Sequence, residues 1–156
     1  MILGMSLRTF TYLHVYISLI AIGAGFIVVY GMIAARRLHV LTNVFLFMTA
    51  LTSLTGFLFP FKGVTPAIVL GILSLIVLAV AIIARRRGWR GTYVISAILA
   101  LYFNFFVLIV QSFQKIPSLH ALAPTQSELP FKLAQFITLV VVIALTTVAF
   151  RKFRPA

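Results

Sequence analysis

The segment that decides the fold runs from Phe113 to Phe131 and reads FQKIPSLHALAPTQSELPF. It holds the chain's only acidic side chain, Glu128, one of its three histidines, His120, and three of its six prolines. This is the one long segment that cannot form a membrane helix, because its prolines interrupt the backbone hydrogen bonding that a lipid environment demands. It therefore predicts a loop between two apolar helices.

The composition of the chain is typical of an integral membrane protein. Hydrophobic residues make up 63% of the chain and charged residues 9%, and the mean hydropathy is +1.19. A soluble domain carries roughly a quarter charged residues, so this chain lacks the residues for a water-exposed surface. Its long uncharged apolar runs indicate the same class.

Five apolar runs predict an all-α integral membrane fold, a bundle of five transmembrane helices in a single domain covering residues 1–156. At 1.5 Å per residue, each run is long enough to cross about 30 Å of hydrocarbon. In the first run, Ala21 and Gly25 have the spacing of small residues that lets a neighbouring helix approach closely. The predicted helices cover about residues 12–35, 40–59, 66–84, 92–113 and 130–150, and an outer loop covers residues 114–129.

The lysines and arginines lie in clusters between the apolar runs, which is how charges mark membrane boundaries. One side carries nine of the thirteen: Arg36, Arg37, Arg85, Arg86, Arg87, Arg90, Arg151, Lys152 and Arg154. The other carries Arg8, Lys62, Lys115 and Lys132. The positive-inside rule puts the larger set in the cytoplasm, so we expect the N-terminus outside and the C-terminus inside. The expected partners are anionic lipid head groups rather than nucleic acid, which needs one solvated basic face.

This orientation puts most polar residues at the outer end of the bundle. His14 lies at the outer end of the first helix and His120 in the outer loop. If the two imidazoles meet, they could hold haem b or another metal group, or bind a quinone head group. The alternative is structural, with His14 at the membrane interface and His120 bracing the loop.

Three further polar residues allow both a structural and a functional interpretation. Asn104 lies just past mid-bilayer and must face protein, water or a cofactor. It either bonds a neighbouring helix or lines a cavity with Gln111, which lies seven residues on along the same face. Glu128 either caps the loop through Thr125 or pairs with a nearby cation, or it accepts a proton if the loop buries it.

The residues that the chain lacks exclude several reaction classes. It has no cysteine, no aspartate and one glutamate, which leaves no Ser–His–Asp triad and no pair of carboxylates. No charged residue lies in the interior of a predicted span, where it could relay an ion or proton. Hydrolase, kinase and pump activities are therefore not expected.

Two stretches carry a resemblance to a known group of proteins. They are TGFLFPF at residues 55–61, followed by Thr65 and Pro66, and HALAPTQSE at residues 120–128. Both resemble small bacterial inner-membrane proteins of uncharacterised activity. The resemblance implies a multi-pass location in the bacterial inner membrane, and it implies no chemistry.

Two hypotheses for the function follow. The first is a small non-catalytic subunit or scaffold that associates with lipid and with larger membrane proteins or with itself; the small size and the apolar run at residues 66–84 favour it. The second is a small redox or ligand-binding protein that holds haem b or a quinone near its periplasmic face. Its candidate ligand-binding residues are His14, His120, Gln111, Asn104 and Glu128.

Overall fold

The computed structural model describes residues 2–60, 63 and 66–154, and within them the chain forms six helices and no strand. Five helices are long and apolar enough to cross a membrane, and α5 is the short exception. The predicted all-helical bundle with five apolar spans is therefore confirmed. The helices are α1 (Leu7–Ile33), α2 (His39–Gly56), α3 (Pro66–Arg87), α4 (Arg90–Lys115), α5 (Pro117–Leu122) and α6 (Leu129–Lys152).

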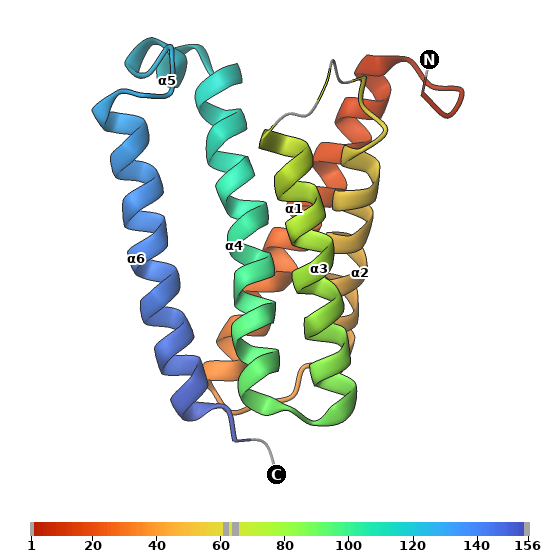
Figure 1. The fold of residues 1–156 in the computed structure, drawn as a ribbon, viewed down its shortest axis with the longest axis vertical. Coiled ribbons are helices and arrows are strands. Elements are labelled where there is room, and N and C mark those ends of the chain that lie inside the picture. Colours follow the sequence, from red (N-terminus) through yellow and green to blue (C-terminus); the bar gives the residue numbers. More distant parts are fainter. Residues whose placement is uncertain (1, 61–62, 64–65, 155–156) are drawn as a thin grey trace.

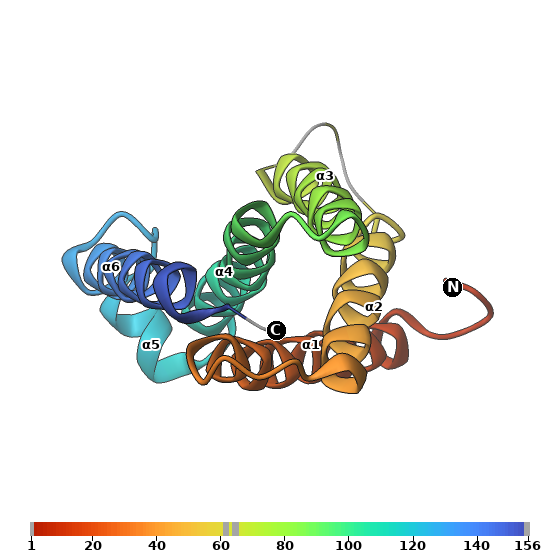
Figure 2. The same cartoon turned by 90° about the horizontal axis from the view of Figure 1, so that it is seen from below.

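Helices α1 to α4 form a closed ring, and α6 stands outside it. Each helix of the ring packs on the next, and α4 packs back on α1 (Figure 2). Helix α6 packs mainly on α4 and also touches α1. The ring's interior is mostly apolar, and its largest fully buried side chains include Phe45, Met32 and Ile98. Burial of these side chains is what holds the four helices together.

A small residue lets α1 approach two helices at once. A methyl group on Gly25 would lie 2.7 Å from Leu101 Cδ1 of α4 and 2.9 Å from the Phe45 ring of α2. Ala21, one turn earlier, is fully buried. The predicted close approach at the Ala21 and Gly25 spacing is therefore found in the fold.

Four of the long helices are longer than the hydropathy pattern indicated, whereas α2 is shorter and ends at Gly56 instead of residue 59. Helix α1 starts at Leu7 instead of Tyr12, because Ser6 caps it by accepting a hydrogen bond from the Thr9 N–H over 3.1 Å. The long arginine side chains are compatible with helix, so α3 continues through its arginine triplet and α4 begins at Arg90. The sharp turn between them uses Gly88 at a φ of +71°.

The predicted loop at residues 114–129 contains a short helix, which is the main difference from the sequence-based prediction. Helix α5 begins at Pro117, where a missing N–H costs nothing because first-turn N–H groups have no helical partner. The rings of Phe113 and Phe131, at the two ends of the segment, lie 5.4 Å apart edge to face. Their contact closes the segment over the tops of α4 and α6 (Figure 1).

Candidate functional site

His14 is held between α1 and α2. Its Nδ1 lies 2.8 Å from Thr55 Oγ1, and its ring packs edge-on against Phe59 with centroids 5.2 Å apart. The Thr55 hydroxyl donates to the Leu51 carbonyl over 2.6 Å, so its oxygen acts as acceptor toward the histidine. This assigns the imidazole proton to Nδ1. The observed role of His14 is to join two helices.

His120 belongs to a different part of the molecule. It lies on α5, and its Nδ1 donates to the Phe113 carbonyl oxygen at the end of α4 over 3.3 Å. In both views α5 lies on the opposite side of the molecule from the N-terminal part of α1, which carries His14 (Figures 1 and 2). Each histidine thus has its own protein partner in a separate helix pair. Joint ligation of haem or a quinone stays a prediction from the sequence.

Asn104 and Gln111 differ in their surroundings although they share a face of α4. Asn104 is buried, and its Nδ2 donates to Thr49 Oγ1 of α2 over 3.2 Å. Gln111 is exposed, two turns further along. The amide of Asn104 therefore has the interhelical partner that its depth requires.

Glu128 organises the turn that leads into α6. Its carboxylate accepts the Thr125 hydroxyl over 2.8 Å and the N–H groups of Thr125 and Ser127 over 3.1 Å each. Desolvation raises the pKa of this carboxyl, but these hydrogen bonds favour the charged form and hold the net pKa below its usual value of 4.5. The carboxylate serves the loop, with the Thr125 spacing that the sequence predicted.

Glutamines tie the N-terminal end of α6 to α4. Gln126 Nε2 donates to the Val110 carbonyl over 2.8 Å, and Gln135 Nε2 donates to the Phe106 carbonyl over 3.3 Å. Gln135 Oε1 is buried and meets no hydrogen-bond donor among the residues that the structure describes. Across those same residues, no three His, Cys, Asp or Glu side chains gather closely enough to hold a metal ion.

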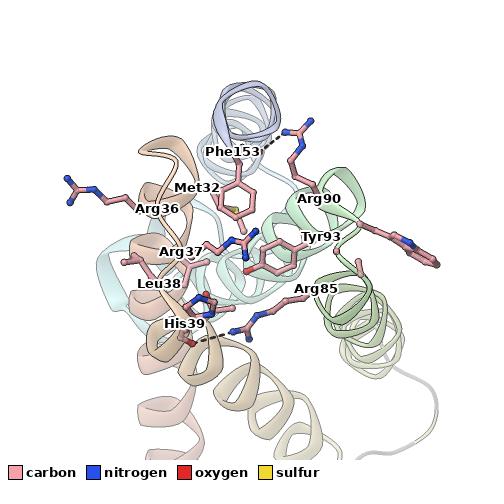
Figure 3. Close-up of a pocket in the computed structure, with 14 residues that line it drawn as sticks. Met32, Arg36, Arg37, Leu38, His39, Arg85, Arg90, Tyr93 and Phe153 are labelled. Carbon is pink, nitrogen blue, oxygen red and sulfur yellow. Dashed lines mark hydrogen bonds between the residues drawn. The ribbon is translucent and has the colours of Figure 1, made fainter. Parts of the chain in front are cut away.

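A second polar region lies at the opposite end of the bundle. The α1–α2 turn, the α3–α4 turn and the residues after α6 surround a cavity of about 290 Å³. Its described lining includes four arginines, one histidine, Trp89 and Tyr93 (Figure 3). The arginines are Arg36, Arg37, Arg85 and Arg90. The sequence predicted that these cations mark the membrane boundary, and it predicted no cavity among them.

Arg85 is anchored at the wall of this cavity. It is half-buried, its Nη1 donates to Asn43 Oδ1 of α2 over 2.6 Å, and its Nη2 lies 3.5 Å from the His39 carbonyl oxygen. The sequence does not distinguish it from Arg86 and Arg87, and only the packing of α3 does. Leu78 and Ala81, seven and four residues earlier, are buried, which puts Arg85 on the inward face of α3.

Arg90 fastens the end of α6 to the start of α4. Its Nη1 donates to the carbonyl oxygens of Phe150 and, over 2.8 Å, Phe153. Its guanidinium carbon also lies 5.1 Å from the centroid of the Phe150 ring. A cation at helix C-terminal carbonyls and on an aromatic face is favourable on both counts.

Comparison with known protein families, with curated proteins and with solved structures finds no match to this chain.

Proposed function

We propose that this chain is a small non-catalytic membrane protein, a subunit or scaffold that spans the bacterial inner membrane five times. The main support for the proposal is that the buried polar side chains form hydrogen bonds between helices. Asn104 bonds Thr49 between α4 and α2, and Ser53 donates to Ser74 between α2 and α3 over 3.1 Å. Polar groups that are used to join helices are typical of a structural bundle.

The outer surface of the bundle supports the membrane part of the proposal. Within α6, which the structure describes in full, Ala149 alone is fully buried. Large apolar side chains such as Phe136 and Ile143 are more than half exposed. A soluble protein rarely exposes so large an apolar surface, whereas lipid or another transmembrane helix covers it without cost.

The charges support the orientation. The nine cations that the sequence assigns to the cytoplasm lie on segments at one end of the bundle, and the start of α6, which Glu128 precedes, lies at the other end (Figure 1). The proposed topology has the basic end at the cytoplasmic leaflet, whose anionic lipids attract Lys and Arg.

Purification from the native membrane in a mild detergent tests the subunit role. We expect the chain to co-purify with a second membrane polypeptide, or with itself, at a fixed stoichiometry in independent preparations. A photo-crosslinking residue in place of exposed Phe136 should capture the same polypeptide, and one in place of buried Ala97 should not. A stable monomer with no crosslink from Phe136 except to lipid would reject the subunit role.

A further inference from the structure

Two arginines at the basic end point into the cavity, while others on the same turns do not. Figure 3 shows the guanidinium group of Arg37 directed toward Tyr93 and that of Arg85 directed toward His39, whereas Arg36 extends away from both. Arg86, next to Arg85, is exposed and lies outside the cavity lining. A boundary charge needs only to reach water or head groups, so the rule that explains Arg36 and Arg86 does not explain an inward orientation.

The contacts of Arg85 fix its position without neutralising its charge. Both of its acceptors, the Asn43 side-chain oxygen and the His39 carbonyl, are neutral groups. A guanidinium has five N–H donors in a planar fork, and these two contacts leave others to face the cavity. Arg85 is therefore pre-oriented, which lowers the entropy lost when a ligand binds.

The positive charges around the cavity repel one another. Arg90 is another of the four arginines in the lining, and its acceptors are also neutral carbonyls. The chain's only acidic side chain, Glu128, directly precedes α6, whose N-terminal end lies at the far end of the bundle (Figure 1). Like charges around a partly desolvated cavity are unfavourable, and an anion bound among them relieves the repulsion.

The geometry favours a phosphate group among anions. Arginine forks match pairs of phosphate oxygens, and two forks from different segments can bind one phosphate. A volume of about 290 Å³ is at the small end for a ligand pocket and fits a phosphate with a short ester substituent. The cavity also lies where the apolar helices end, at the depth of lipid head groups.

We propose that this cavity binds a phosphate ester anion, with Arg37 and Arg85 as its charged ligands. Two sources share this chemistry, namely the head group of an anionic phospholipid and a free phosphomonoester. Binding of a phospholipid head group rests on the membrane location proposed above, whereas binding of a free phosphomonoester does not. Binding at this site would couple the α1–α2 turn to α3 and α4.

Trp89, the chain's only tryptophan, lines the cavity and provides the measurement. The protein is placed in nanodiscs of phosphatidylcholine with increasing fractions of phosphatidylglycerol, and separately in phosphatidylcholine nanodiscs with added glycerol 1-phosphate or inorganic phosphate. We expect a saturable change in Trp89 fluorescence. Saturation by phosphatidylglycerol alone identifies a lipid head group, and saturation by the soluble esters identifies a free phosphate ligand.

Matched variants distinguish specific binding in the cavity from nonspecific attraction to surface charge. Arg37→Gln and Arg85→Ala should each weaken binding about tenfold or more, the effect of losing one charge-assisted hydrogen bond. Arg86→Ala removes the same charge from the neighbouring residue and should change binding less than twofold. Arg85→Lys, which keeps the charge and helix propensity, should restore part of the affinity if Arg85→Ala fails to fold.

Equal losses in Arg86→Ala and Arg37→Gln, or no saturable signal from any phosphate compound, would overturn the proposal. Alkaline carbonate extraction of the host membranes is run on the same variants. A chain that binds phosphate but is released by carbonate would contradict the membrane location alone, and a membrane-resident chain that binds none would contradict the phosphate site alone.

Discussion

Asn104 Nδ2 donates to Thr49 Oγ1 over 3.2 Å, and this bond crosses the middle of the four-helix ring from α4 to α2. Both residues are buried, with exposed fractions of 8% and 0%. Their hydrogen bond is therefore shielded from water, and each group depends on the other for a partner.

A double-mutant cycle measures that dependence. Asn104→Ala and Thr49→Val should show a coupling free energy of about 0.6–1.7 kcal/mol in thermal unfolding monitored by circular dichroism in detergent. Gln111→Ala, on the same face of α4 but exposed, is the control and should leave stability nearly unchanged. Additive effects of the two core substitutions would show that the bond contributes nothing.

Gly25 should resist enlargement, and Gly23 should not. Gly25→Ala drives a methyl group into Leu101 and Phe45 and should destabilise the fold by about 1–2 kcal/mol through overpacking. The space around a Cβ on Gly23 is open within 4 Å. Gly23→Ala should therefore be neutral or stabilise by up to about 1 kcal/mol through helix propensity. Equal effects of the two on the melting temperature would contradict the packing of α1.

The loop before α6 should respond to acid. Because hydrogen bonds lower the pKa of Glu128, the carboxylate stabilises the turn fully above pH 4.5. That stabilisation is lost as the pH falls through the lower folded value. Glu128 is the only acidic side chain, so its ¹³C resonance is the only side-chain carboxyl signal that titrates. We expect a midpoint below 4.5 that rises in Thr125→Ala; a midpoint at or above 4.5 in the unmodified chain is inconsistent with these hydrogen bonds.

His14 and His120 should act independently. His14 bonds α2 and His120 bonds α4, so the stability losses of His14→Ala and His120→Ala should add within about 0.3–0.5 kcal/mol. Two histidines that share a haem or quinone would instead show strong coupling and, for haem, a Soret band lost in either variant. The double variant and an absorption spectrum of the purified chain decide between these outcomes.

The sequence predicted the parts of the fold that depend on hydropathy alone. The five long helices were predicted from apolar runs that are too hydrophobic to face water. The need of Asn104 for a protein partner was predicted from the cost of an unpaired amide in hydrocarbon. Helix α5 was missed because Pro117 reads as a helix breaker in a loop, whereas it is favourable at a helix start.

The basic cavity could not be predicted in the same way. Its formation depends on which face of α3 turns inward and on α2 lying beside it, so that Asn43 reaches Arg85. Neither relation is encoded in local hydropathy, and the positive-inside rule treats Arg85 and Arg86 alike. Similarly, only the pairing of α6 with α4 gives Gln135 its partner at Phe106.

The most direct test of the account is the side of the membrane on which each end of the bundle lies. The chain contains no cysteine, so single cysteines can be introduced at exposed Ser118 on α5 and at exposed Ala34 beside the arginine turn. A membrane-impermeant maleimide applied to intact spheroplasts should label Ser118→Cys, and should label Ala34→Cys only after the membrane is permeabilised. Labelling of Ala34→Cys in intact spheroplasts, with Ser118→Cys protected, would contradict the proposed orientation.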